Sequence, residues 1–229
     1  MESMNHLFTD FDAVLFDLDG TLVETNIDFP LMKREMLNLA TSCGVSVSQL
    51  AGLDILAIVD RMAHHIRFKE GAPAADNARR RALSILQEIE LRHSKDAKEI
   101  PPARELIDYL KCQNIKVGIV TRNCRAASED SLVRTGLHPD VLIAREDVGR
   151  AKPAPDQLRM ALQYLDVEPE RAVMIGDHPM DVAAGNAAGM RTIGLLPAGK
   201  EDNYYASVNP DAIARDLREI LSAVIDNHR

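Results

Sequence analysis

The chain has 229 residues, of which 46% are hydrophobic and 27% charged, a composition typical of globular proteins and unlike that of disordered or collagen-like chains. Its 27 basic and 35 acidic side chains give a formal net charge of −8. Because nucleic-acid binding depends on phosphate neutralisation and base stacking, this charge, together with 4% aromatic residues and no tryptophan, argues against a nucleic-acid partner.

The three cysteines, Cys43, Cys112 and Cys124, are widely separated in the sequence. This spacing matches neither a disulfide framework nor a zinc cluster, so we expect reduced thiols and a cytoplasmic protein. No apolar stretch approaches the ~18 residues that a membrane-spanning helix needs, so we expect no membrane association. The sequence is compatible with a monomer or a homodimer.

The first predicted element is a short apolar strand at residues 13–16. The next ~75 residues contain three stripes of apolar residues at helical spacing, within 28–43, 55–66 and 78–89, and no strand candidate interrupts them. They predict a helical insert. We place this cap domain at residues 25–99, with the core domain formed by residues 1–24 and 100–229.

After the insert, short apolar runs alternate with helical patterns. Four further strands are expected at 117–120, 141–143, 173–175 and 192–195, and a last helix at about 210–225. Nearly continuous apolar runs of this length favour strands buried on both faces, as in a parallel sheet. The alternation predicts an α/β fold with a doubly wound, Rossmann-like sheet.

Polar residues follow four of these runs, and ligands of open α/β sheets bind at the carboxyl ends of the strands. Gly20 and Thr21 offer backbone N–H groups suited to an anion, as does a helix beginning after Thr121. In an extended segment Asp17 and Asp19 would point to the same side. The acidic side chains would repel one another without a cation, and hard oxygen ligands favour Mg²⁺. The full set is Asp17, Asp19, Gly20, Thr21, Thr121, Arg122, Asn123, Lys152, Asp177 and Asp181.

Four segments carry a family resemblance: FDLDGTLVET, GIVTRN, EDVGRAKPAPD and IGDHPMDVAAGNAAGM. They resemble, in order, the four signature motifs of the haloacid dehalogenase superfamily of phosphohydrolases. The resemblance covers about residues 7–29 and 100–196. It implies that Asp17 is a nucleophile forming an aspartyl phosphate and that Asp19 is the general acid and base.

The same resemblance implies the remaining roles. Thr121 and Lys152 would bind phosphate, and Mg²⁺ would be held by Asp17, the backbone carbonyl of Asp19, and the two acids of the last motif, Asp177 and Asp181. The helical insert resembles the cap of phosphoglycolate-phosphatase-like members. The expected partner is therefore a small phosphorylated metabolite, with phosphoglycolate as the best analogy.

Two alternatives stay open at this point. Phosphomutases of the same superfamily tend to carry a histidine a few residues beyond the first motif. This alternative is disfavoured because residues 25–29 contain no histidine. A signalling or binding protein that is phosphorylated on aspartate would have about half this length and no helical insert. Arg122 could contact a second anionic group of the substrate or could be a solvated cation at a helix start. His178 could lie near substrate, but a role in loop packing is favoured.

Overall fold

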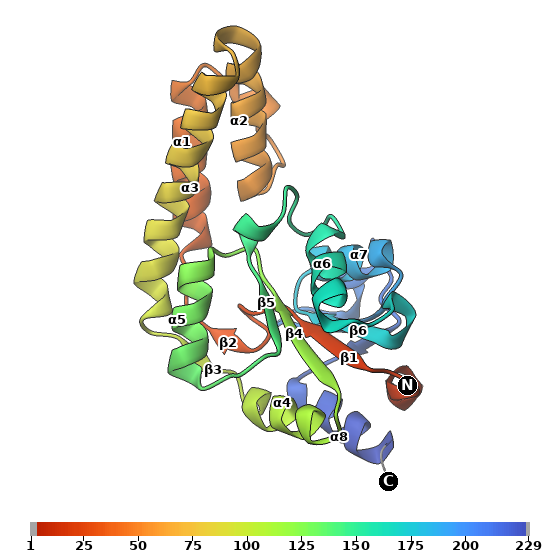
Figure 1. Cartoon of the computed structure of the whole chain (residues 1–229). Helices are drawn as coiled ribbons and strands as arrows, with labels where there is room; N and C mark the ends of the chain where they lie inside the picture. The colour runs from red at the N-terminus through yellow and green to blue at the C-terminus, as the bar shows by residue number, and fades with distance from the viewer. Residues whose placement is uncertain (1–3, 228–229) are drawn as a thin grey trace. The chain divides into compact units, whose positions relative to one another are not determined.

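The computed structural model describes residues 4–227 and divides into two compact units (Figure 1). One unit comprises the described residues up to Thr25 together with those from Ser94 onward, and the other is Asn26–His93. No helix in the described part of the chain is both long and apolar enough to cross a membrane.

Within residues 4–227, the first unit contains a six-stranded parallel sheet in the order β5-β4-β1-β6-β7-β8. Phe16 at the end of β1 pairs with Ile119 on one side and with Ile175 on the other, so β1 lies in the interior of the sheet. The strands are β1 (Ala13–Phe16), β4 (Lys116–Val120), β5 (Val141–Ile143), β6 (Ala172–Gly176), β7 (Arg191–Leu195) and β8 (Ala212–Ala214). This architecture confirms the predicted α/β core.

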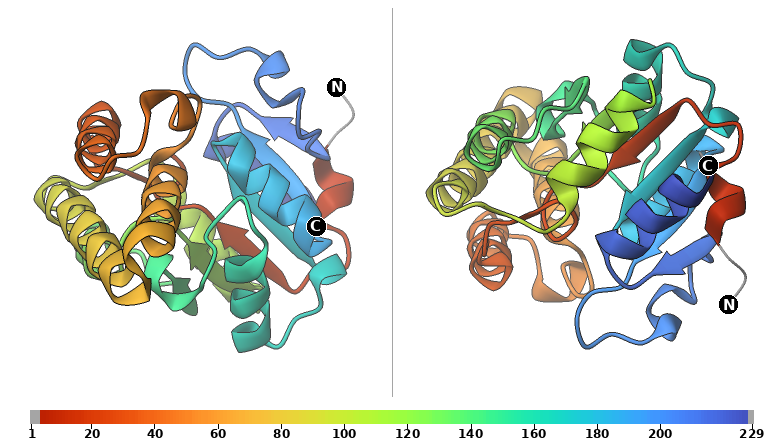
Figure 2. Two further views of the ribbon diagram at one scale, coloured as in Figure 1. Left: turned by 90° about the horizontal axis from the view of Figure 1, so that it is seen from above. Right: turned by 90° about the horizontal axis from the view of Figure 1, so that it is seen from below.

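Helices cover both faces of the sheet, as Figure 2 shows from two sides. Helices α4 (Ala103–Cys112) and α8 (Leu217–Asn227) pack on the face that carries Val14 and Phe16. Helices α6 (Asp156–Leu165) and α7 (Pro179–Ala188) pack on the face that carries Leu15. Both faces are thus apolar, which explains why the strands read as continuous hydrophobic runs. The unit also contains α5 (Arg125–Thr135) and the short 3₁₀ helices η1 (Met4–Phe8), η3 (Arg145–Asp147), η4 (Pro169–Arg171) and η5 (Asp202–Tyr205).

The second unit is helical. Its helices are α1 (Phe29–Ser42), α2 (Ile55–Glu70) and most of α3 (Ala72–Ser94), with the short η2 (Val47–Gln49). Asp28 and Asp54 cap the first two helices by accepting backbone N–H bonds, at 2.8 Å from Leu31 and 3.0 Å from Leu56. Met36, Met62 and Leu86 contribute to a separate apolar core, so each unit buries its own hydrophobic surface.

The boundaries between the units differ slightly from the predicted ones. The sequence predicts them at 24/25 and 99/100, whereas the structure divides the chain after Thr25 and after His93. The difference arises because β3 (Lys98–Glu99) pairs antiparallel with β2 (Val23–Glu24), which ties residues near 99 to the sheet-containing unit.

The predicted start of the last helix is wrong. Residues 212–214 form strand β8, which adds to the sheet edge beside β7, and the helix begins only at Leu217. Asp211 fixes this pairing, because its carboxylate accepts the Thr192 backbone N–H at 2.7 Å. The short Ala-Ile-Ala segment continues the apolar periodicity of the helix, which is why the pattern alone does not distinguish the two.

Candidate active site

Three carboxylates meet at the carboxyl ends of β1 and β6. Asp17 directly follows β1, Asp177 directly follows β6, and Asp181 lies in the first turn of α7. One oxygen of each lies within 4.8 Å of the others, so the three side chains together could hold a metal ion. Asp181 is oriented by the backbone, since its Oδ2 accepts the His178 N–H at 3.0 Å.

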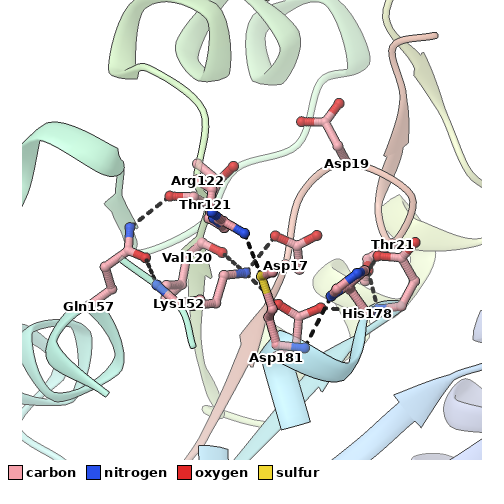
Figure 3. A network of polar contacts seen from close by, with 12 residues as sticks. Asp17, Asp19, Thr21, Val120, Thr121, Arg122, Lys152, Gln157, His178 and Asp181 are labelled. Carbon is pink, nitrogen blue, oxygen red and sulfur yellow. Dashed lines mark hydrogen bonds and ion pairs between the residues drawn. The ribbon is translucent and has the colours of Figure 1, made fainter. Parts of the chain in front are cut away.

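Lys152 reaches this cluster from the segment before α6 (Figure 3). Its ammonium nitrogen lies 2.6 Å from Asp17 Oδ1, 2.7 Å from Asp181 Oδ1 and 2.7 Å from the Val120 carbonyl. These three acceptors match the three hydrogens of an ammonium group. The Lys152 side chain is 1% exposed, so a buried charge is fully paired.

Burial dominates the protonation behaviour of the cluster. Burial raises the pKa of Asp17 to about 6, although Lys152 opposes the rise and Asp181 adds to it. Burial together with the charges of Asp17 and Asp181 raises the pKa of Asp177 to about 7. Burial alone would lower the pKa of Lys152, but the two carboxylates outweigh it and leave that pKa raised. The carboxylates thus carry more negative charge than one lysine compensates, which is the environment that a divalent cation would stabilise.

Gly20 and Thr21 pack directly against Asp177. The Thr21 hydroxyl donates to Asp177 Oδ1 at 3.3 Å and accepts the Asp177 backbone N–H at 3.1 Å. Gly20 has a φ of +85°, and a Cβ there would collide with the Asp177 carboxylate, so only glycine fits. The Gly20 N–H donates to the Val23 carbonyl at 2.9 Å.

The Asp19 side chain lies apart from these three carboxylates, on the loop beyond Asp17 in Figure 3. The Thr25 hydroxyl donates to one of its oxygens and the Asn123 amide donates to the other. These two hydrogen bonds fix the direction of the Asp19 side chain. The chain turns after Asp17, because the Leu18 carbonyl accepts the N–H groups of both Leu22 and Val23.

The end of β4 supplies the other predicted phosphate ligands. Thr121 is buried, and its hydroxyl accepts the Asn123 N–H at 3.1 Å, which forms a tight turn before α5. The Arg122 guanidinium extends toward the first turn of α7 and donates to the sulfur of Met180 (Figure 3). Arg122 thus lies at the same end of the sheet as Asp17.

A family model described as haloacid dehalogenase-like hydrolase matches residues 14–195. This range includes Asp17, Thr121, Lys152 and Asp177. The chain belongs to this family.

Sequence relatives in the family align over nearly the whole chain. Pyrophosphatase PpaX from Bacillus thuringiensis strain Al Hakam is 32% identical over 220 residues, which is 95% of this chain and 98% of the relative. Pyrophosphatase PpaX from Oceanobacillus iheyensis is 28% identical over 225 residues, covering 94% and 97%.

Solved structures of hydrolases share the fold. A phosphonoacetaldehyde hydrolase-like protein from Oleispira antarctica superposes with a TM-score of 0.68 at 19% identity, covering 97% of this chain and 94% of that one. A HAD family hydrolase from Deinococcus radiodurans R1, with bound phosphate and sodium, gives a TM-score of 0.62 at 23% identity, covering 96% and 97%. At these identities the similarity establishes the hydrolase fold.

The hydrolase core thus brings Asp17, Thr21, Lys152, Asp177 and Asp181 into one cluster. It places Asp19 and Asn123 in direct contact with each other beside that cluster.

His178 caps α7, because its Nδ1 accepts the Met180 N–H at 3.1 Å, and this contact fits the expected loop-packing role.

Three polar residues beside the site have roles that the sequence did not predict, although Thr25 is the last residue of the segment FDLDGTLVET. Thr25 holds Asp19, Gln157 bonds to the segments that carry Thr121 and Lys152, and the Arg145 guanidinium donates to the Arg122 carbonyl at 3.1 Å. All three side chains are buried. No spacing rule marks them, because each acts through a backbone group or side chain that comes near only in the folded chain.

Proposed function

We propose that this chain is a Mg²⁺-dependent phosphatase that hydrolyses a small phosphorylated metabolite through an aspartyl phosphate on Asp17. The main support for this proposal is that four side chains lie together at one end of the sheet. They are the carboxylate proposed as nucleophile, Asp17, the buried Lys152, and two further carboxylates, Asp177 and Asp181. Membership of the hydrolase family supports the same reaction class.

In the first step an Asp17 oxygen attacks phosphorus, forming a new O–P bond as the bond to the leaving oxygen breaks. Lys152 and the hydroxyl of Thr121 stabilise charge on the phosphoryl oxygens. Asp19 supplies a proton to the leaving oxygen. Mg²⁺ held by Asp17, Asp177, Asp181 and the backbone carbonyl of Asp19 would neutralise negative charge on the phosphoryl group.

In the second step a water molecule attacks the phosphorus of the aspartyl phosphate, and the bond to Asp17 breaks. Asp19 takes a proton from that water, which returns the acid to its starting form and releases inorganic phosphate. The Thr25 and Asn123 bonds to Asp19 support this role, since they orient both carboxyl oxygens.

Helices α1, α2 and α3 of the second unit are proposed to form the cap that selects the substrate. Two substrate classes are favoured. Phosphoglycolate follows from the resemblance of the insert, and pyrophosphate follows from relatives named Pyrophosphatase PpaX. Both carry a second anionic group, which the Arg122 guanidinium would meet with paired hydrogen bonds. The phosphomutase alternative remains disfavoured, because residues 25–29 contain no histidine.

The test is phosphate release from a panel that includes phosphoglycolate, pyrophosphate, sugar phosphates, nucleotides and p-nitrophenyl phosphate. We expect release to require Mg²⁺ and to stop when a chelator is added. Asp17→Asn should abolish turnover with an unchanged fold, because the amide is nearly isosteric and cannot attack phosphorus. Asp19→Asn should slow turnover by about 10²–10⁴-fold. Full activity of the metal-free protein, or of a folded Asp17→Asn protein, would contradict the proposal.

A further inference from the structure

Gln157 is a completely buried amide at the start of α6, with 0% of its surface exposed. Its Nε2 donates to the Thr121 carbonyl at 2.7 Å and to the Ala144 carbonyl at 3.0 Å. Its Oε1 accepts the Lys152 backbone N–H at 3.0 Å. Both amide hydrogens and the amide oxygen are therefore used (Figure 3 shows the bonds to Thr121 and Lys152).

The three partners belong to three different segments. Thr121 follows β4, Ala144 follows β5, and Lys152 lies in the segment that leads into α6. The amide itself is held firmly, because the next residue, Leu158, and Ala161 one turn later are 0% exposed and pack in the core beneath the sheet. Gln157 thus fixes three segments from one rigid helix end.

The segment that contains Ala144 is itself hydrogen-bonded to the turn that carries Thr121. Ala144 is followed by Arg145, whose backbone N–H donates to the Asn123 carbonyl at 3.0 Å and whose guanidinium donates to the Arg122 carbonyl at 3.1 Å. The turn that carries Thr121 is consequently held both directly by Gln157 and indirectly through the segment after β5.

We propose that Gln157 is a positioning residue for phosphate, which holds the Thr121 turn and Lys152 at the spacing at which both contact one phosphoryl group. This inference rests on the proposed function, which assigns phosphate binding to Thr121 and Lys152. An amide suits the position because it offers two donors to two carbonyls and one acceptor to one N–H. A charged or apolar side chain of the same size satisfies fewer of these groups.

The test compares Gln157→Met and Gln157→Glu with Gln163→Met, a control at an exposed position of the same helix. Methionine keeps the approximate shape but leaves all three backbone groups without their partner. Glutamate keeps the acceptor for Lys152 and loses the paired donation to the two carbonyls. The readouts are amide hydrogen exchange in the segments 121–124 and 144–152, affinity for inorganic phosphate with Mg²⁺, thermal stability, and kcat and KM for p-nitrophenyl phosphate.

We expect Gln157→Met to exchange faster in both segments, to bind inorganic phosphate about tenfold more weakly, and to lose on the order of 10²-fold in kcat/KM. Gln157→Glu should keep slow exchange at Lys152 and lose protection at 121–124. Gln163→Met should match the wild type in every readout.

Two results would overturn the inference. One is a Gln157→Met protein with unchanged exchange in both segments. The other is a variant whose melting temperature falls while its phosphate affinity and KM stay at the control values, since that pattern reports a purely structural role. If the wild type itself neither bound phosphate nor released it from any substrate, the proposed function would fail as well. If the wild type did both and Gln157→Met matched it, only the role of Gln157 would fail.

Discussion

Lys152 and Arg122 place two cations at one end of the sheet in very different surroundings. Lys152 is buried and bonded to Asp17, Asp181 and a backbone carbonyl, so its charge is held at the carboxylate cluster, where the reacting phosphoryl group is proposed to bind. Arg122 is partly exposed and its guanidinium contacts the thioether of Met180, which is a weak acceptor. An anionic substrate group would be a stronger acceptor than this sulfur. Under the proposed function, Arg122 is therefore the cation to test as the contact for a second anionic group of the substrate.

Substitution of Arg122 tests this difference. Arg122→Ala should lower kcat/KM for pyrophosphate or phosphoglycolate. The corresponding loss of transition-state stabilisation should be about 1.5–3 kcal/mol, the range of a charged hydrogen bond. It should barely affect p-nitrophenyl phosphate, which lacks a second anionic group. Steady-state kinetics on both substrates give the ratio of the two losses. Arg218→Ala, at an exposed arginine paired with Asp216, is the control. Equal losses on both substrates, or no loss on either, would contradict a contact between Arg122 and a second anionic group.

At the scale of elements, Tyr205 of the 3₁₀ helix η5 packs closely against strand β7. Tyr205 is 1% exposed, and its hydroxyl donates to the Leu195 carbonyl at 2.7 Å and lies 3.3 Å from the Gly176 carbonyl. Its ring lies against Gly194, where a Cβ would approach the ring carbons at 2.6 Å. Gly176 directly precedes Asp177, so this packing supports the backbone beside the carboxylate cluster.

The close approach of Gly194 to the Tyr205 ring predicts that a larger residue at position 194 lowers the free energy of unfolding. Gly194→Ala should destabilise the protein by about 1–3 kcal/mol, because the added methyl group overpacks a buried site that contains a large ring. Urea denaturation measures the change. Gly149→Ala is the matched control, since a Cβ there has no neighbour within 4 Å among the described residues. A Gly194→Ala protein as stable as this control would show that Tyr205 moves aside freely.

The sequence predicts five of the six strands of the described parallel sheet, because each is a nearly continuous apolar run, a signal that depends only on local burial. It does not predict β2 or β3, which are two residues long, or β8, whose formation depends on pairing with β7. Because Asp17 and Asp177 directly follow predicted strands, the sequence likewise predicts that both lie at the carboxyl edge of the sheet. Asp19 is bonded by Asn123 and Gln157 is bonded to three backbone groups on other segments, and such partners could not be predicted from spacing.

At the scale of the whole molecule, the carboxylate cluster should make stability depend on pH and metal. The pKa of Asp177 is raised to about 7 and that of Asp17 to about 6, both above the ordinary value of 3.8. Between about pH 4 and pH 7 the native state therefore holds protons that the unfolded state has released. The contribution of these groups to stability falls as the pH rises through this range.

The pH-dependent contribution of Asp177 to stability can be isolated with Asp177→Asn, because asparagine is nearly isosteric with aspartate and does not ionise. In chelator, the melting temperature of the wild type minus that of the variant should fall as the pH rises from 5 to 8. Mg²⁺ should raise the wild-type melting temperature more at pH 8 than at pH 5, because the metal competes with protons for the carboxylates. A difference that stayed constant with pH, or a Mg²⁺ effect that was larger at pH 5, would contradict the raised pKa.

The interior position of β1 has a consequence for biosynthesis. This strand is made before both of its neighbours, because β4 and β6 begin only at Lys116 and Ala172. At about 5–20 residues per second, the ribosome needs several seconds to supply the first neighbour and several more for the second. During that interval the helical segment Asn26–His93 is contiguous and can already collapse on itself. The apolar residues of β1 remain without their sheet neighbours until then, so we expect the nascent chain to expose this apolar strand at that stage.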